Sequence, residues 1–349
     1  MRSWHLPLVV FAAANAVLIV VAVVGLLADS RELSGAPIWL KPLKFAVSFV
    51  LYGFALAWMI SLMQRRPRWG YWLGVLVTVT GVIEMAIIVG QVIRGRQSHF
   101  NVETPLDSTL WSVMAGSIVL LWLATLAVAI LLLRERIADR VLAVGIRLGL
   151  GIALIGMALG IFMGVPTSEQ QDALASGEGN RSGSHSVGVE DGGRGMPLTG
   201  WSSTGGDLRI GHFVGLPRSS GLATSRPRTR GRCQPELLAS RRRIRLGLVV
   251  VGAATWLGLT LLLAWQALRG QPLLAPDGLT LMVLAGLVLA AVIGVTVVLR
   301  VSRETVRAWT IEKAHPAWAR STRSTVRLMV FRYSTHAHPG NRRCVDSSG

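Results

Sequence analysis

The sequence predicts an all-α, polytopic membrane helix bundle with seven clear transmembrane helices. Of its 349 residues, 51% are hydrophobic and only 15% are charged, whereas soluble domains carry about 25% charged residues. Seven apolar runs also reach the roughly 20 residues that a helix needs to cross the hydrocarbon core. Because lipid offers the backbone no hydrogen-bond partners, helices are the expected form of these runs. The runs are Pro7–Leu27, Lys44–Met63, Trp69–Ile93, Thr109–Leu133, Val141–Gly164, Ile244–Leu268 and Leu279–Leu299.

The apolar runs and the polar segments between them divide the chain into five regions. The first run is longer than the roughly 7–15 apolar residues of a signal peptide, so we expect it to be retained as a helix. The regions are a five-helix membrane region (1–164), a Gly/Ser-rich extracytoplasmic loop (165–211), a disrupted sixth-helix region with a basic linker (212–243), two C-terminal helices (244–300) and a basic, disordered tail (301–349).

The net charge of +18 does not indicate a nucleic-acid partner. Most arginines lie in short clusters at the ends of the apolar runs, where positive residues orient membrane proteins, and no repeated basic and aromatic surface is present. The two cysteines, Cys233 and Cys344, are too few and too far apart for a metal site or a disulfide framework. We expect no metal and no cofactor, and the expected partners are the lipid bilayer and a small-molecule or lipid ligand. The oligomeric state is left open.

The arginines also predict an orientation, and they raise a problem of parity. Two short basic loops, 65–68 and 134–140, are expected on the cytoplasmic side of the cell membrane, together with the N-terminus. With seven crossings, the later basic clusters at 241–245 and 300–307 would both lie outside. One further crossing, at about 212–232, places both inside. The charge pattern therefore calls for an eighth helix. Because the stretch where it would lie is rich in arginine, serine and proline, we expect this helix to be lost or disrupted.

Three pairs of short motifs indicate a duplicated four-helix unit, in a 4+4 arrangement. They recur in the same order, each at the outer edge of an apolar run. If the unit is duplicated, "LRIGHF" opens the sixth helix as "LKPLKF" opens the second. Convergent interface chemistry is the alternative explanation. The pairs are "LKPLKF" (Leu40–Phe45) with "LRIGHF" (Leu208–Phe213), "GQVIRG" (Gly90–Gly95) with "WQALRG" (Trp265–Gly270), and "TPLDSTL" (Thr104–Leu110) with "APDGLTL" (Ala275–Leu281).

Several blocks, "GAPIWLKPLKF", "RGRQSHFNVETP", "GMPLTGWSSTGGDLRIGHFVGL" and "WQALRGQPL", resemble a family of uncharacterised bacterial multi-pass membrane proteins. The resemblance covers the chain from Gly35 to Arg300 and implies no established activity. Members of the family continue the "HFVGL" block into an apolar helix, whereas this chain departs at Pro217. Loss of one base from codons for Leu-His-Ala-Leu-Gln yields "LPRSS", so we expect a frameshift after Leu216. A genuine hydrophilic loop is the alternative.

Glu84 is the only acidic residue well inside an apolar run. A charge near mid-membrane costs roughly 2.5–3.5 kcal/mol on insertion scales, so it usually faces a partner or a wet cavity. One hypothesis is a structural pair of Glu84 with Lys44 or Asn15, and the other is a polar floor to a cavity that opens to the outer face. The candidate ligand-binding residues of that cavity are Glu84, Gln91, Arg94, His99, Lys44, Arg209, His212, Gln266 and Arg269.

The sequence contains no nucleophile elbow, phosphate loop or zinc motif, and it identifies no catalytic residue. The leading hypothesis is binding or transport of a small or amphipathic ligand at an outward-facing polar cavity. The alternative is a membrane-embedded enzyme that acts on a lipid or quinone, with Glu84, His99 or His212 as acid or base. A third hypothesis is a structural or sensory membrane component. A transporter would move label into proteoliposomes, whereas an enzyme would turn over in detergent without a gradient.

Overall fold

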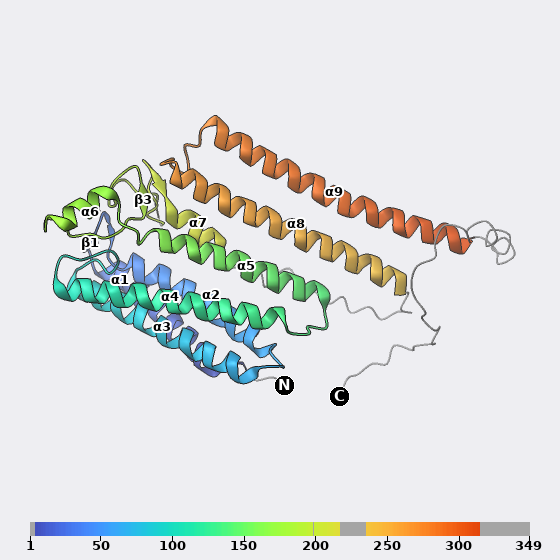
Figure 1. The fold of residues 1–349 in the computed structure, drawn as a ribbon, viewed down its shortest axis with the longest axis horizontal. Coiled ribbons are helices and arrows are strands. Elements are labelled where there is room, and N and C mark those ends of the chain that lie inside the picture. The colour runs from blue at the N-terminus through green and yellow to red at the C-terminus, as the bar shows by residue number, and fades with distance from the viewer. Residues whose placement is uncertain (1–3, 198, 217–234, 315–349) are drawn as a thin grey trace. The chain divides into compact units, whose positions relative to one another are not determined.

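The computed structural model describes residues 4–197, 199–216 and 235–314, with the backbone alone at 235–240 and 302–314. This part of the chain forms nine helices and four short strands (Figure 1). The helices are α1 (Leu6–Ala28), α2 (Leu40–Ser61), α3 (Pro67–Arg94), α4 (Pro105–Leu133), α5 (Arg140–Phe162), α6 (Ser168–Ala175), α7 (Leu208–Gly215), α8 (Pro235–Leu268) and α9 (Gly278–Ala314). The strands are β1 (Glu32–Leu33), β2 (Ala36–Pro37), β3 (Ser186–Val187) and β4 (Gly206–Asp207).

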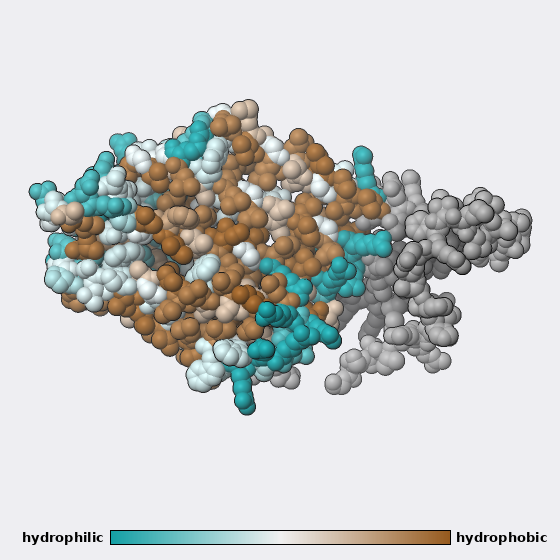
Figure 2. All heavy atoms as spheres, viewed as in Figure 1, coloured by the Kyte–Doolittle hydropathy of each residue, from teal (hydrophilic) through white to brown (hydrophobic). Residues whose placement is uncertain are grey.

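Seven of the described helices are long and apolar enough to span a membrane. They are α1 to α5, the Arg241–Leu268 part of α8 and the Gly278–Val301 part of α9. The predicted all-α bundle is confirmed, and the chain is a multi-pass membrane protein. Hydrophobic residues cover the visible sides of the helices, while hydrophilic residues gather near the helix ends (Figure 2). Lipid chains contact such sides favourably, whereas charged groups remain near water.

The helices α1 to α5 share one apolar core. Leu8 of α1, Leu56 of α2, Ile88 of α3 and Met114 of α4 belong to it and are at most 1% exposed. α1 and α2 approach closely at Gly53, where an added Cβ would lie 3.3 Å from the Leu8 carbonyl oxygen. Small residues allow this close approach of helix backbones, which is how membrane helices gain packing energy in lipid.

Local signals end the helices near the candidate site. α3 ends at Gly95, whose φ of 70° lies in the left-handed region that favours glycine. α4 follows Thr104, whose hydroxyl accepts a hydrogen bond from the Asp107 backbone N–H. α2 begins at Leu40, four residues before the predicted start at Lys44, because charged side chains in a first helical turn can still reach the polar connections.

Two regions hold more structure than the sequence predicts. The connection 165–211, expected as a Gly/Ser-rich loop, contains α6, the antiparallel pair of strands β3 and β4 and the start of α7. α9 continues to Ala314, through the first part of the segment expected to be a disordered tail. Of the predicted eighth-helix segment at about 212–232, the first residues belong to α7. The rest of that segment, the predicted frameshift after Leu216 and the remaining tail at 315–349 lie outside the described residues.

The helices α5 and α8 run in the same direction. α7 lies antiparallel to both, so α5 and α8 both end where α7 begins. α7, which is eight residues long, therefore runs back along α5 and α8 from the end at which both of these helices finish. The contacts that fix these directions are Gly215 with Gly156 and His212 with Gly160 for α5, and Gly215 with Thr260 and Gly211 with Ala264 for α8.

Motifs that the sequence pairs across the two halves adopt the same local structure. α2 and α7 each begin at the first leucine of their motif, Leu40 and Leu208, and an antiparallel pair of two-residue strands precedes each helix. β1 and β2 are joined by residues 34–35 alone, whereas β3 and β4 are joined by the long segment 188–205. The agreement in helix start and in the preceding strand pair is what a duplicated unit predicts.

The turns after α3 and α8 match in finer detail. In each, a glycine takes the left-handed conformation, a glutamine amide donates to a carbonyl six residues later, and an arginine pairs with an aspartate near the next helix start. The matching groups are Gly95 (φ 70°) and Gly270 (φ 71°), Gln91 to Gln97 O and Gln266 to Pro272 O, and the ion pairs Arg94–Asp107 (2.7 Å) and Arg269–Asp277 (2.6 Å).

The close contact of α5 with α7 yields a test of packing. A Cβ on Gly156 would lie 2.7 Å from the Gly215 backbone, whereas one on Gly151 of the same helix would meet nothing within 4 Å. We expect Gly156→Ala to lower the free energy of unfolding by about 1–3 kcal/mol through overpacking. Gly151→Ala should be neutral or stabilising by up to about 1 kcal/mol, since alanine favours helix. Reversible denaturation in detergent measures both, and equal stabilities would contradict the contact.

Candidate functional site

A cavity of about 170 Å³ lies at the end of the bundle where α2 and α7 begin, which we call the loop end. The β1–β2 hairpin, the first turns of α2 and α7, the α3–α4 connection and the long α5–α7 connection all contribute to its wall. Apolar residues on the helices include Leu40, Phe45, Ile88, Val92 and Phe213. The charged residues and histidines that line it are Lys41, Lys44, Arg96, His99, Arg181, His185, Glu190, Asp191 and Arg209.

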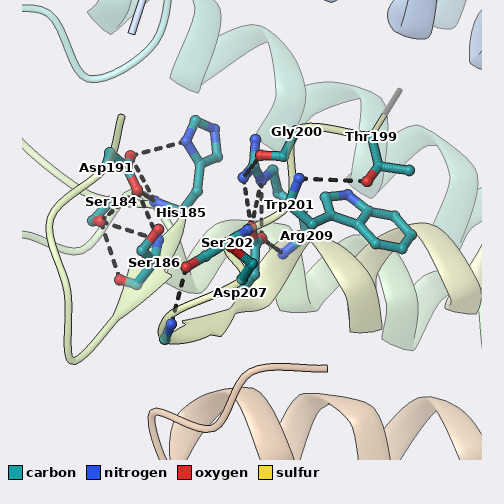
Figure 3. A network of polar contacts seen from close by, with 12 residues as sticks. Ser184, His185, Ser186, Asp191, Thr199, Gly200, Trp201, Ser202, Asp207 and Arg209 are labelled. Carbon is teal, nitrogen blue, oxygen red and sulfur yellow. Dashed lines mark hydrogen bonds and ion pairs between the residues drawn. The ribbon is translucent and has the colours of Figure 1, made fainter. Parts of the chain in front are cut away.

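Asp191 organises the part of the α5–α7 connection that lies at the cavity (Figure 3). Its carboxylate accepts hydrogen bonds from the backbone N–H groups of His185 (3.0 Å) and Ser186 (2.9 Å). Arg181 Nη2 and His185 Nδ1 lie 2.9 Å and 3.0 Å from the same carboxylate. Burial alone would raise the pKa of Asp191, but the hydrogen bonds from His185 and Ser186 outweigh burial and hold this pKa well below its usual range.

Asp207 organises the second part of the connection, next to the start of α7 (Figure 3). Its fully buried carboxylate pairs with the Arg209 guanidinium at 2.5 Å. Arg209 Nη2 also donates to the Gly200 carbonyl at 2.7 Å, and Lys44 Nζ donates to the neighbouring Thr199 carbonyl at 2.9 Å. The lysine of α2 and the arginine of α7 thus hold the same short stretch of chain.

Lys41 and Lys44 differ from the other cations of the cavity. Within the described part of the chain, neither lysine has a carboxylate at ion-pair distance, and Lys41 makes no hydrogen bond. Buried Glu84 attracts Lys41 from a longer distance, whereas Lys44 and Arg209 repel it. The remaining cations are each compensated, in the ion pairs Arg96–Glu103, Arg181–Asp191 and Arg209–Asp207.

Glu84 does not form either of the pairs that the structural hypothesis predicted. Lys44 instead contacts the α5–α7 connection, and Asn15 Nδ2 donates back to the Phe11 carbonyl within α1. Glu84 is fully buried, with Oε1 3.4 Å from His99 Nε2. Neither carboxylate oxygen accepts a hydrogen bond from a described residue. Its partner is therefore the histidine of the α3–α4 connection, which the sequence placed at the outer edge.

His99 separates Glu84 from the cavity. Its ring lines the cavity and packs against the rings of Phe45, Phe100 and Trp111. Burial lowers the pKa of His99, so the imidazole is neutral near pH 7. Because Nε2 faces Glu84 and Nδ1 lies 3.2 Å from Ser98 Oγ, both ring nitrogens already have protein neighbours.

The structure brings together only part of the predicted site. Lys44, His99 and Arg209 line the cavity, and Glu84 lies behind His99. The other five candidates are engaged elsewhere and do not line this cavity. Gln91 and Arg94 bond Asp107, Gln266 bonds the Pro272 carbonyl, Arg269 pairs with Asp277, and His212 Nδ1 lies 2.8 Å from the Gly156 carbonyl oxygen of α5.

The contribution of the long α5–α7 connection to this cavity was not predicted from the sequence. Arg181, His185 and Asp191 come from a glycine-rich stretch that the sequence suggested was only a loop. The stretch "SHSVGVEDGG" does contain a signal, since an aspartate followed by glycines is typical of turns whose carboxylate binds nearby backbone N–H groups. Lys41 belongs to the motif "LKPLKF" at the outer edge of an apolar run, but only the folded structure shows that it has no carboxylate partner among the described residues.

Comparisons with known proteins add no function. No family model, curated protein or solved structure matches the chain. Among the described residues, no group of three or more His, Cys, Asp or Glu side chains is placed to hold a metal ion. The cavity and its charges are therefore the basis for a functional proposal.

The His185–Asp191 contact predicts a pH-dependent loop. Burial lowers the pKa of His185 from 6.5 to about 4 in the folded connection, which is the closed form of the loop. When the loop opens and His185 reaches water, its pKa returns toward 6.5. Between these two values, the open loop therefore binds a proton that the closed loop does not. The closed form should lose stability as the pH falls, by up to about 1.4 kcal/mol per pH unit. Hydrogen exchange of amides 184–191, corrected for intrinsic rates, measures this loss. His185→Asn should remove most of the dependence, and an unchanged pH profile in that variant would contradict the assignment.

Proposed function

We propose that this membrane protein binds a small or amphipathic ligand with an anionic group in the loop-end cavity. The observation that carries the proposal is that Lys41 and Lys44 both line the cavity without a carboxylate at ion-pair distance. Two ammonium groups three residues apart on one face at the start of α2 attract anions, and the N-terminal end of the α2 dipole adds to the attraction. Binding an anion would relieve their mutual repulsion.

The size of the cavity favours a small ligand or a head group. Sites for drug-sized ligands occupy about 300–1,000 Å³, whereas this cavity measures about 170 Å³. Leu40, Phe45 and Ile88 supply apolar wall next to the lysines. A ligand that combines an anionic group with a short apolar portion matches both parts of the lining, and transport of such a ligand is a use of the same site.

Removal of the lysine charges tests this proposal. In maltoside detergent, dodecyl phosphate should raise the thermal unfolding midpoint of the wild type. Lys41→Met and Lys44→Met should each weaken its binding by about tenfold or more, because a charge-assisted hydrogen bond contributes about 1.5–3 kcal/mol. Arg136→Met, which removes an exposed charge between α4 and α5, is the matched control. Equal thermal shifts in all four proteins would contradict the proposed site.

The pair of His99 and Glu84 favours a second candidate, a membrane-embedded enzyme acting on a lipid or quinone. A histidine that is backed by a buried carboxylate can exchange protons with a bound molecule. Both ring nitrogens of His99 already face protein groups, Glu84 and Ser98. His99 would therefore have to give up one of these neighbours before it could exchange a proton with a bound molecule. Turnover in detergent without a gradient, abolished by His99→Gln, would support the enzyme over a binding protein.

We also propose that the protein resides in a cell membrane with its N-terminus in the cytoplasm. The supporting observation is that two arginine-rich connections, α2–α3 and α4–α5, lie at the same end and touch through the Arg65 N–H and the Glu135 carboxylate (2.9 Å). Reporter fusions after Arg66 and Arg136 should therefore read cytoplasmic, and fusions after His99 and Gly192 external. A cytoplasmic signal at Gly192 would reverse the orientation.

A further inference from the structure

The cavity lies between residues that occupy equivalent positions in the two halves of the chain. Aligning the motifs "LKPLKF" and "LRIGHF" pairs Lys41 with Arg209 and Phe45 with Phe213, and all four residues line the cavity. The structure supports this pairing as well, since α2 and α7 start at the same motif position and both run away from the loop end (Figure 1). One ligand in this cavity would thus contact both halves.

We propose that Lys41 and Arg209 bind the same oxyanion, a phosphate or carboxylate group, with the apolar part of the ligand between Phe45 and Phe213. This inference rests on the proposed function and specifies the chemistry of its ligand. The two cations come from equivalent first turns, so the bound anion joins α2 to α7 and bridges the two halves of the bundle.

The hydrogen bonds of Arg209 and Lys41 support complementary roles for these two cations. Arg209 uses Nε and Nη2 to hold Asp207 and the Gly200 carbonyl, while its Nη1 donates to no described residue. Lys41 Nζ likewise has no hydrogen bond in the described chain. Arg209 therefore offers donors fixed in direction by Asp207, and Lys41 offers the positive charge that balances the anion.

The equivalence between α2 and α7 is incomplete at one position. Lys44 and His212 occupy matching places, yet Lys44 Nζ contacts the Thr199 carbonyl at the cavity, while His212 Nδ1 lies 2.8 Å from the Gly156 carbonyl oxygen of α5. The cavity therefore receives two cations from α2 and one from α7. This asymmetry favours a ligand whose anionic group lies nearer α2.

A double-mutant cycle tests whether the two cations share one anion. Dodecyl phosphate binding would be measured by calorimetry in maltoside detergent for the wild type, Lys41→Met, Arg209→Lys and the double variant. Arg209→Lys keeps the charge beside Asp207 but removes the planar fork, so the fold is retained. Each single change should weaken binding about tenfold or more, and the double change should weaken it by less than the product. Arg269→Lys, at an arginine that pairs with Asp277 outside the cavity, is the matched control.

The outcomes separate this inference from the proposed function. If the wild type binds and Lys41→Met weakens binding, but Arg209→Lys behaves like Arg269→Lys, the shared anion is refuted while the binding site stands. If the wild type does not bind dodecyl phosphate, inorganic phosphate or nanodisc phosphatidylglycerol, both are refuted. Equal binding of inorganic and dodecyl phosphate would identify a free oxyanion, and selective binding of the two lipid-like probes would identify a head group. Either result, with coupling in the cycle, supports the inference.

Discussion

A helix in a bilayer satisfies its own backbone hydrogen bonds, and this constraint determines where the protein can place its polar chemistry. Long apolar helices leave little room for charge along their length, and Glu84 is the exception among the acids. Most of the remaining charged groups lie where helices start and stop. The cavity, its lysines and its carboxylate-centred turns all lie at such ends. The position of the candidate site thus follows from the solvent that surrounds the helices.

Most of the fold could be predicted from the sequence because the membrane imposes a strong pattern. All seven apolar runs coincide with long helices, and the motif at Leu208 does open a helix. The errors occur where packing rather than hydropathy decides. α2 starts earlier than its apolar run because the first turn tolerates Lys41 and Lys44, and the long connection folds because Asp191 and Asp207 bind its backbone. Hydropathy carries no information about such contacts.

The candidate site was only partly predictable for a related reason. Depth relative to the ends of the apolar runs is readable from sequence, so Lys44, His99 and Arg209 were expected at one end of the bundle, and all three line the cavity at the loop end. The direction of a side chain around the helix axis and the course of a long loop cannot be read from sequence. Gln91 and Gln266 were therefore assigned to a cavity, although each amide donates a hydrogen bond within the turn that follows its own helix. Their matching roles in the two halves suggest that the turns were inherited together with the helices they end.

The contact between Lys44 and Thr199 joins residues that are 155 positions apart in the chain. A cavity closed by such distant segments has a consequence for biogenesis. While the chain is being synthesised, α1 to α5 can enter the membrane and pack before the segment that completes the cavity has left the ribosome. Glu84 and Lys41 must then reside in an unfinished bundle whose loop end is open to water. The ligand site is therefore one of the last features to mature, and truncated chains would insert without acquiring it.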